Sequence, residues 1–278
     1  MNALFRYPGS KWSLTQWIIS HFPEGYEKMV YLEPFLGSGA VFFNKRPSCV
    51  ETINDLDGDV TNLFRVLRER PEELALALRL TPYSREEYNT AFEPCGDPLE
   101  KARRFIVKTT QAIGARMDGK SGWRNHKQPE IGGSAGKWHQ TSNGVLEAAK
   151  RLLGDFTHLV QIEQMDALRL VERYDNPQCL IYLDPPYLRS TRRSGALYHC
   201  ELDEEYHKRL LEAIRKSRAH ILISGYDSHL YREALAGWGW DCAVSRLTST
   251  GQATEMLWYN FQPPCEQMTI WQEYQRIV

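Results

Sequence analysis

The residues best suited to chemistry form a tetrapeptide in the second half of the chain, Asp184-Pro185-Pro186-Tyr187. It follows an apolar run, 179–183, that is typical of a buried parallel strand. Two prolines cannot continue a strand, so the chain must turn at the carboxyl end, where open α/β sheets bind their ligands. The turn offers a carboxylate, rigid backbone carbonyls and an aromatic ring. An amino group on a flat base needs acceptors for its N–H groups and a ring to stack on, and this turn supplies both.

A glycine-bearing loop upstream predicts a second binding element. The apolar stretch 29–32 predicts a short strand, and Phe35, Gly37 and Gly39 follow it. Glycines after a strand let the backbone approach a ligand closely and open a helix. A nicotinamide dinucleotide fingerprint would require a third glycine where Phe42 stands, so the sequence argues against an NAD-linked oxidoreductase.

An acid at the end of the next predicted strand extends this pattern. The run 49–53 predicts that strand, and Asp55 follows it, about 20 residues past Gly37, a spacing at which an acid can bind ribose hydroxyls. Taken singly, the glycines could form an ordinary turn and Asp55 could cap a helix. Together they favour a ligand that contains a nucleoside.

Composition limits the kind of protein. The chain has 278 residues, of which 42% are hydrophobic and 25% charged, as in a globular protein with one large domain or a domain with an insert. Six cysteines include no C-x-x-C pair, so we expect no metal site and no disulfide scaffold. No run is apolar and long enough for a signal core or a membrane span, which predicts a cytoplasmic protein without membrane association.

The net charge of −1 conceals a basic segment. Residues 101–144 hold nine Lys and Arg against Asp118 and Glu130, so this segment carries +7 and the rest of the chain −8. Trp123 and Trp138 lie in its second part, which is predicted to be irregular. Basic and aromatic residues in one loop suit phosphate contacts and base stacking, which favours nucleic acid as a partner. The alternatives are a solvated basic surface and tryptophans that only anchor the loop.

Alternating apolar strands and amphipathic helices predict an α/β fold, with a Rossmann-like, mostly parallel sheet and helices on both faces. Helices are expected at 15–21, 59–80, 84–92, 99–113, 144–153 and 203–218, with Pro71 opening a second helix inside 59–80 and Ile113 facing inward. Further strands are expected at 159–162 and 219–224, and a closing β-hairpin at 240–247 and 256–261.

The order of these parts resembles a known family. The stretch 7–11, the loop 33–39, Asn54-Asp55, a long middle segment and the tetrapeptide follow one another as in S-adenosylmethionine-dependent DNA adenine-N6 methyltransferases of the Dam-like (D12, α) class. Residues 224–227 and 255–260 add to a resemblance that covers most of the chain. Through 122–125 and 191–192 it is closest to members found on phages and mobile elements. The middle segment lacks the Asn- and Phe-rich pattern of the housekeeping GATC enzymes.

The resemblance implies a domain organisation and an activity. Residues 1–60 and 143–278 would form the catalytic core, and 61–142 an inserted, mainly helical target-recognition domain. The activity would be site-specific transfer of a methyl group from S-adenosylmethionine to N6 of adenine in double-stranded DNA, with the base flipped out. No obligatory protein partner is implied.

The resemblance also assigns residues. Asp184 and Pro185 would accept hydrogen bonds from N6, next to Pro186, and Tyr187 would stack on the base. The cofactor residues would be Tyr7, Lys11, Phe35, Gly37, Gly39, Asp55 and Asp166. The DNA-binding residues would be Arg116, Lys120, Arg124, Lys127, Arg189 and Arg192. Cytosine N4 or RNA adenine as the acceptor, and a DNA-binding regulator with weak or no catalysis, remain alternatives.

Overall fold

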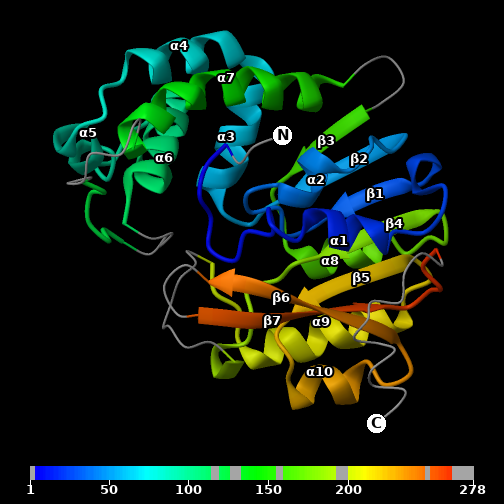
Figure 1. Cartoon of the computed structure of the whole chain (residues 1–278). Coiled ribbons are helices and arrows are strands. Elements are labelled where there is room, and N and C mark those ends of the chain that lie inside the picture. The colour runs from blue at the N-terminus through cyan, green and yellow to red at the C-terminus, as the bar shows by residue number, and fades with distance from the viewer. Residues whose placement is uncertain are drawn as a thin grey trace.

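The computed structural model describes residues 4–113, 119–125, 133–154, 159–191, 200–247 and 251–264. Its centre is a seven-stranded sheet in the order β3-β2-β1-β4-β5-β7-β6 (Figure 1). The strands are β1 (Val30–Glu33), β2 (Val50–Asn54), β3 (Leu159–Glu163), β4 (Cys179–Leu183), β5 (His220–Gly225), β6 (Gly239–Leu247) and β7 (Gly251–Tyr259). The first five are parallel, and β7 runs antiparallel to β5 and β6. The predicted α/β fold with a closing hairpin is confirmed.

Two apolar cores cover the two faces of this sheet. Along β4, Leu180 and Tyr182 belong to one core, while Ile181 and Leu183 belong to the other, as the alternation of a strand requires. The helices are α1 (Thr15–Ser20), α2 (Ala40–Asn44), α3 (Gly58–Glu69), α4 (Pro71–Leu80), α5 (Arg85–Thr90), α6 (Pro98–Gln111), α7 (Gly133–Leu153), α8 (Ala167–Arg173), α9 (Glu204–Lys216) and α10 (His229–Ala234), with short 3₁₀ turns η1 (Tyr26–Lys28) and η2 (Arg189–Thr191).

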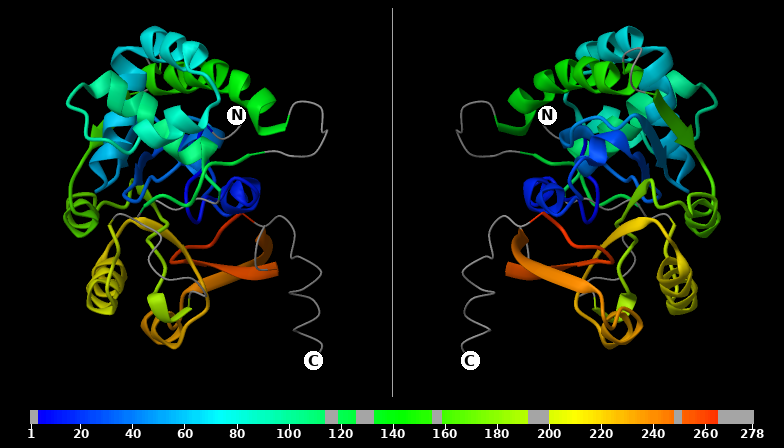
Figure 2. Two further views of the ribbon diagram at one scale, coloured as in Figure 1. Left: turned by 90° about the vertical axis from the view of Figure 1, so that its left-hand side faces the viewer. Right: turned by 90° about the vertical axis from the view of Figure 1, so that its right-hand side faces the viewer.

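The helices α3 to α7 gather on one side of the molecule, away from the β6–β7 hairpin, α9 and α10 (Figures 1 and 2). Aspartates begin several helices: the side chains of Asp57, Asp97 and Asp203 accept hydrogen bonds from backbone N–H groups at the starts of α3, α6 and α9. Residues 61 and 142, which bound the expected insert, lie within α3 and α7.

Helix α7 begins at Gly133 and not at Gly144, so the prediction of an irregular stretch up to 144 was wrong. Buried residues recur along it at helical spacing, from Trp138 through Val145 and Ala149 to Leu152. The indole Nε1 of Trp138 donates to the carbonyl of Thr81 at 2.8 Å. This packing against the end of α4 stabilises a Gly- and Ser-rich sequence that has little helix propensity of its own.

Ile113 is 55% exposed, which corrects its predicted place on the inward face of a helix. Helix α6 ends at Gln111, and the chain then forms an isolated bridge between Ala112 and Trp123. Ile113 therefore leaves the helical stripe. None of the described helices is long and apolar enough to cross a bilayer.

Candidate active site

The carboxyl ends of β1, β2 and β4 open into one cavity. Because these strands are parallel neighbours, the loops that follow them meet at the same edge of the sheet. Of the residues predicted from sequence, those that line the cavity are Tyr7, Lys11, Phe35, Gly37, Asp55, Asp184 and Pro186. The structure thus brings together segments from the start, the first quarter and the second half of the chain.

The two carboxylate oxygens of Asp184 have different surroundings. The Lys11 ammonium lies 2.9 Å from Oδ1, and the Ser224 hydroxyl donates to the same atom at 2.9 Å. No donor from the described residues reaches Oδ2. Since the side chain is 20% exposed and lines the cavity, Oδ2 is an acceptor open to a ligand.

The rest of the tetrapeptide forms the wall behind Asp184. Pro185 is buried, and Tyr187 is 7% exposed. The Tyr187 ring packs edge-on against Tyr226 with centroids 4.6 Å apart, and the Lys11 ammonium lies 4.7 Å from its centroid. The hydroxyl of Tyr187 is buried without a hydrogen-bond partner among the described atoms. The aromatic ring is therefore fixed beside Asp184.

The loop after β1 needs its glycines. Gly37 has φ +49, and a Cβ there would lie 2.9 Å from the Tyr7 ring. A side chain at this position would therefore displace the Tyr7 ring, which lines the cavity. Gly39 has φ +65, precedes α2, and would place a Cβ 2.9 Å from the Phe43 ring. Both positions require a left-handed backbone that only glycine adopts readily.

Asp55 fixes this loop from the end of β2. Its Oδ2 accepts the backbone N–H of Gly37 at 2.8 Å, and its Oδ1 accepts that of Asp57 at 2.9 Å. Burial raises the pKa of Asp55 to about 6, although these N–H groups oppose the rise. Each carboxylate oxygen has a second lone pair, so Asp55 can still accept hydrogen bonds from a ligand hydroxyl.

Glu33, at the end of β1, also lines the cavity and was not found from the sequence. The Tyr31 hydroxyl donates to its Oε2 at 2.7 Å. Burial raises the pKa of Glu33 to about 8, and the nearby Asp184 carboxylate adds to the rise. The sequence did signal this residue, because Glu33 opens the stretch 33–39 that carries the family resemblance.

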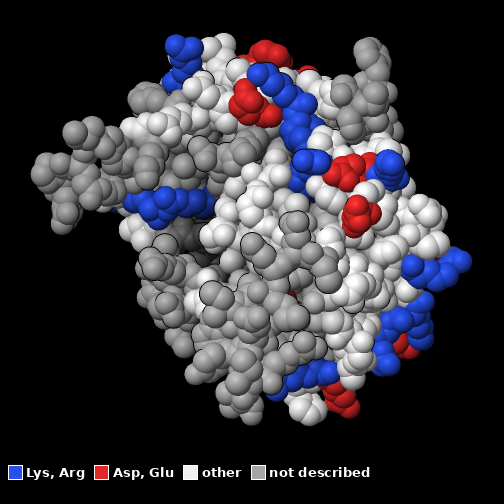
Figure 3. Space-filling model, turned by 45° about the vertical axis from the view of Figure 1, so that its right-hand side comes forward, with Lys and Arg blue, Asp and Glu red and all other residues white. Residues whose placement is uncertain are grey.

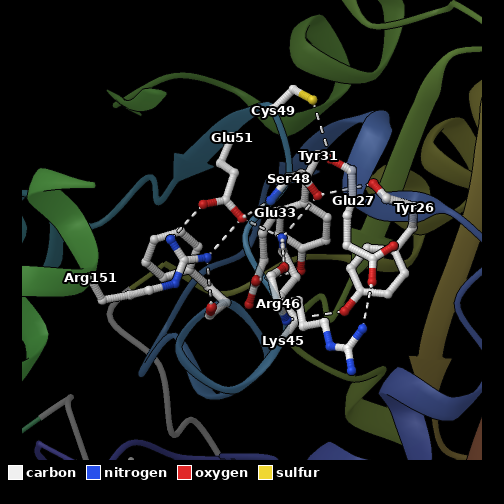
Figure 4. A network of polar contacts seen from close by, with 11 residues as sticks. Tyr26, Glu27, Tyr31, Glu33, Lys45, Arg46, Ser48, Cys49, Glu51 and Arg151 are labelled. Carbon is white, nitrogen blue, oxygen red and sulfur yellow. Dashed lines mark hydrogen bonds and ion pairs between the residues drawn. The ribbon is translucent and has the colours of Figure 1, made fainter. Parts of the chain in front are cut away.

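Behind Glu33 lies a buried ion network that ties α2, β2 and α7 together (Figure 4). Glu51 forms an ion pair with Lys45 and accepts two hydrogen bonds from the Arg151 guanidinium, at 2.5 and 2.7 Å. Burial acts to raise the pKa of Glu51, but Arg151 and Lys45 outweigh it, and the net pKa is lowered. The network anchors α7 to the sheet beneath the site.

Asp166 faces a different set of partners. Its Oδ1 accepts the N–H groups of Leu168 and Arg169 at the start of α8, and its Oδ2 accepts the Tyr206 hydroxyl at 3.0 Å. The residues on either side of Asp166 in the chain, Met165 and Ala167, line the cavity. Cys200, Leu202 and Tyr206 line it too, and none of these five residues was predicted from the sequence.

The expected DNA-binding residues fall into two groups. Arg116, Lys127 and Arg192 lie outside the described residues. Lys120 is exposed beside the Phe92 ring, and Arg189 is exposed with Glu201 4.0 Å away. Arg124 is half-buried, its Nε donates to the carbonyl of Ala112 at 3.1 Å, and its backbone carbonyl accepts the Tyr83 hydroxyl.

Ion pairing reduces the charge that the basic segment presents. On α6, Arg103 pairs with Glu87 and Glu100, Arg104 pairs with Glu100, and Lys108 pairs with Asp59. On the face drawn in Figure 3, Lys and Arg form separate groups among Asp, Glu and uncharged atoms, and one group borders a hollow.

The two tryptophans of the segment differ. Trp138 is 3% exposed and anchors α7, as its bond to Thr81 shows. Trp123 is half-buried, and its indole donates to Gln111 while the Arg85 guanidinium lies 5.0 Å from its ring. Of these two side chains, only Trp123 is partly exposed to solvent.

A mostly parallel sheet with a closing antiparallel hairpin, a glycine loop and an acid after β2 fit the class of S-adenosylmethionine-dependent methyltransferases that the order of the motifs resembles. The residues present fit this cofactor. Asp55 offers a carboxylate to ribose hydroxyls, and Glu33 and Asp184 line the cavity, where a positive sulfonium or ammonium group would favour the ionised form of Glu33. A family model described as D12 class N6 adenine-specific DNA methyltransferase matches residues 7–245. The chain belongs to this family, and it is an enzyme that methylates N6 of adenine in DNA.

Relatives agree with this assignment. The DNA adenine methylase of Salmonella typhi is 26% identical over 254 residues, covering 84% of this chain and 83% of the relative. The DNA adenine methylase of Escherichia coli (strain K12) is 24% identical over the same shares of the two chains. The DNA N-6-adenine-methyltransferase of Escherichia phage P1 is 33% identical over 90 residues, which are 32% of this chain and 11% of that protein.

Proposed function

We propose that the protein methylates a specific adenine in double-stranded DNA after that base has left the helix and entered the cavity at Asp184. Inside a duplex the amino group cannot reach an enclosed site, so the base has to be flipped out. The observation that carries the proposal is the open Oδ2 of Asp184, on a carboxylate whose Oδ1 is held by Lys11 and Ser224.

Asp184 and Pro185 act on the nucleophile. The lone pair of adenine N6 is delocalised into the ring, which makes the nitrogen a poor nucleophile. Hydrogen bonds from N6 to Oδ2 of Asp184 and to the Pro185 carbonyl favour a tetrahedral nitrogen and stabilise the positive charge that develops on it. Pro186 keeps the turn rigid, and Tyr187 stacks on the base. S-adenosylmethionine supplies a methyl group already activated on a sulfonium, so alignment does much of the remaining work.

The cofactor residues bind different parts of S-adenosylmethionine. Asp55 accepts the ribose hydroxyls, and Phe35 with Gly37 and Gly39 forms the loop beneath the nucleoside. Tyr7 and Lys11 contact the methionine part or the adenine of the cofactor; the support is that both line the cavity, with the Tyr7 ring next to Gly37. Asp166 accepts from the adenine amino group of the cofactor; the support is that its chain neighbours line the cavity.

DNA is bound by the helical part and by the turn after β4. The expected insert 61–142 carries Lys120 and Arg124, together with Arg116 and Lys127, and the turn carries Arg189 and Arg192. Trp123 and the nearby Arg85 add an aromatic and a basic group to the same surface. The resemblance of 122–125 and 191–192 to phage and mobile-element members supports an enzyme that is bacterial or phage-encoded and acts on cellular DNA.

The test is to incubate the purified protein with labelled S-adenosylmethionine and unmethylated genomic DNA, and then to sequence the methylated bases. We expect N6-methyladenine within one sequence motif. Asp184→Ala should abolish methylation and leave cofactor affinity, measured by calorimetry, largely intact. Asp175→Ala is the matched control, because this partly exposed acid lies before β4, at the other end of the strand. Methylcytosine as the product, or normal turnover by Asp184→Ala, would overturn the proposal.

A further inference from the structure

Glu255 reaches the site from the closing hairpin. It lies in β7 opposite Ala243 of β6 and is 3% exposed. On the same face of β7, Leu257 belongs to the core that contains Tyr182 of β4. A buried carboxylate on this apolar face is costly unless a positive group balances it.

The positive group is the ammonium of Lys11. Its Nζ lies 3.5 Å from Oε1 of Glu255 and 2.9 Å from Oδ1 of Asp184, and it donates to the carbonyl of Gly9 at 2.6 Å. The Lys11 side chain is 5% exposed. Oε1 of Glu255 has no hydrogen-bond partner within the described part of the chain, and the Lys11 ammonium is the positive group that balances its charge. One ammonium is therefore held between two carboxylates from β4 and β7.

This arrangement bears on which oxygen of Asp184 is open. Attracted by Asp184 alone, a buried ammonium could bridge both carboxylate oxygens and occupy the acceptor that the amino group needs. The Glu255 carboxylate, with Oε1 3.5 Å from the same ammonium, competes with Oδ2 for it. Ser224 holds the same Oδ1 from β5, so the carboxylate cannot simply rotate.

We propose that Glu255 is a positioning residue for methyl transfer: it fixes the ammonium of Lys11 on Oδ1 of Asp184 and so reserves Oδ2 for the amino group of the target base. The inference rests on the proposed role of Asp184. Nothing in the family assignment or in the sequence motifs gave Glu255 a role.

The charged groups around Glu255 predict a dependence on pH. Lys11 faces it from the N-terminal segment and Asp184 from the turn after β4, while Glu33 at the end of β1 faces Asp184. Burial raises the pKa of Glu255 to about 7, Lys11 opposes the rise, and Asp184 adds to it. Below this pH Glu255 becomes neutral and its hold on Lys11 weakens.

The test is a double-mutant cycle on the full-length enzyme, with Glu255→Gln, Lys11→Met and the combined variant. The readout is the single-turnover methylation rate at saturating S-adenosylmethionine and DNA. We expect Glu255→Gln to slow the reaction by about 10- to 100-fold, as misplaced reacting groups do, with cofactor affinity little changed. The double variant should be no slower than Lys11→Met, because Glu255 acts through Lys11.

Two further measurements separate positioning from folding. Asp241→Asn is the control, since Asp241 is a buried carboxylate of β6 that accepts from Trp17 and pairs with His21, outside the site. The fold-reductions in rate caused by Asp241→Asn and by Lys11→Met should multiply in the combined variant. The rate ratio of wild type to Glu255→Gln should shrink toward one as the pH falls through about 7.

A ratio that stays constant with pH, or an effect of Glu255→Gln that multiplies fully with Lys11→Met, would overturn the inference. If Asp184→Ala is inactive in the same assays, the proposed function survives that result. An active Asp184→Ala enzyme would remove both.

Discussion

A comparison of two glycines separates the cost of backbone strain from the loss of ligand binding, because Gly37 lines the cavity and Gly25 does not. Gly37 and Gly25 have φ of +49 and +73, but a Cβ would meet the Tyr7 ring at 2.9 Å only at Gly37, with nothing within 4 Å at Gly25. Gly37→Ala should weaken S-adenosylmethionine binding by about tenfold or more, the equivalent of about 1.4 kcal/mol. Gly25→Ala should cost only the left-handed strain, about 1–2 kcal/mol of unfolding free energy. Calorimetry and urea unfolding measure the two effects, and equal cofactor affinities would contradict the assignment of Gly37.

Glu33 should make the stability of the cofactor-free protein depend on pH. Its pKa in the folded state is about 8, against an ordinary value of 4.5, so between these values the folded state binds more protons than the unfolded chain. The stabilisation that Glu33 gives to the folded state is fully present below about pH 4.5 and is lost as the pH rises through about 8. As the pH rises across this range, the unfolding free energy of the wild type should therefore fall relative to that of the Glu33→Gln variant.

Urea unfolding of both proteins at several pH values checks this. Glu72→Gln, on the exposed side of α4, is the control and should show a difference from wild type that hardly changes with pH. The same constant difference for Glu33→Gln would mean that Glu33 is already ionised in the folded state.

At the scale of elements, Trp138 should decide whether α7 stays packed against the end of α4. The side chain is 3% exposed and bonds to Thr81. Trp138→Ala should lower the unfolding free energy by about 3–5 kcal/mol, the usual cost of removing a buried tryptophan. Trp240→Ala on β6 is the control, since that side chain is 48% exposed and its removal should cost far less. Thermal and urea unfolding measure both, and equal losses would mean that α7 does not depend on Trp138.

The sequence anticipated the strands better than the helices. The run 179–183 is continuously apolar, and β4 has those bounds, because a strand buried on both faces needs apolar residues throughout. Helix α7 was cut short because its first half is rich in Gly and Ser, and only its packing partner in α4 stabilises it. Ile113 was misplaced because periodicity does not mark where α6 ends.

At the scale of the whole molecule, DNA binding should depend on Arg124 in one of two ways. A phosphate contact predicts that Arg124→Ala weakens every duplex similarly and lowers the salt slope by about one unit. A contact with a guanine edge predicts a loss of about 1–3 kcal/mol that is confined to cognate DNA. Titrations of cognate and scrambled duplexes at several salt concentrations distinguish these.

Arg46→Ala is the matched control for that experiment. Its side chain is 83% exposed and lies just before β2, at the edge of the sheet away from the cavity, so DNA binding should not change. If Arg124→Ala also binds both duplexes like wild type at every salt concentration, the interface lies elsewhere, with Arg189 and Arg192 as the next candidates.

The sequence by itself determined the local chemistry: the Asp184 turn, the glycine loop, Asp55, and an order of motifs that was enough to indicate the family. These signals are local because a turn or a tight loop restricts the residues in its own few positions. Glu33, Ser224 and Glu255 lie in stretches that carried the resemblance, but only the tertiary structure decided how they join the site. It also decided that Arg103, Arg104 and Lys108 of α6 are paired. Their partners come from other strands and helices, and a charge has a role only once burial and its neighbours are fixed.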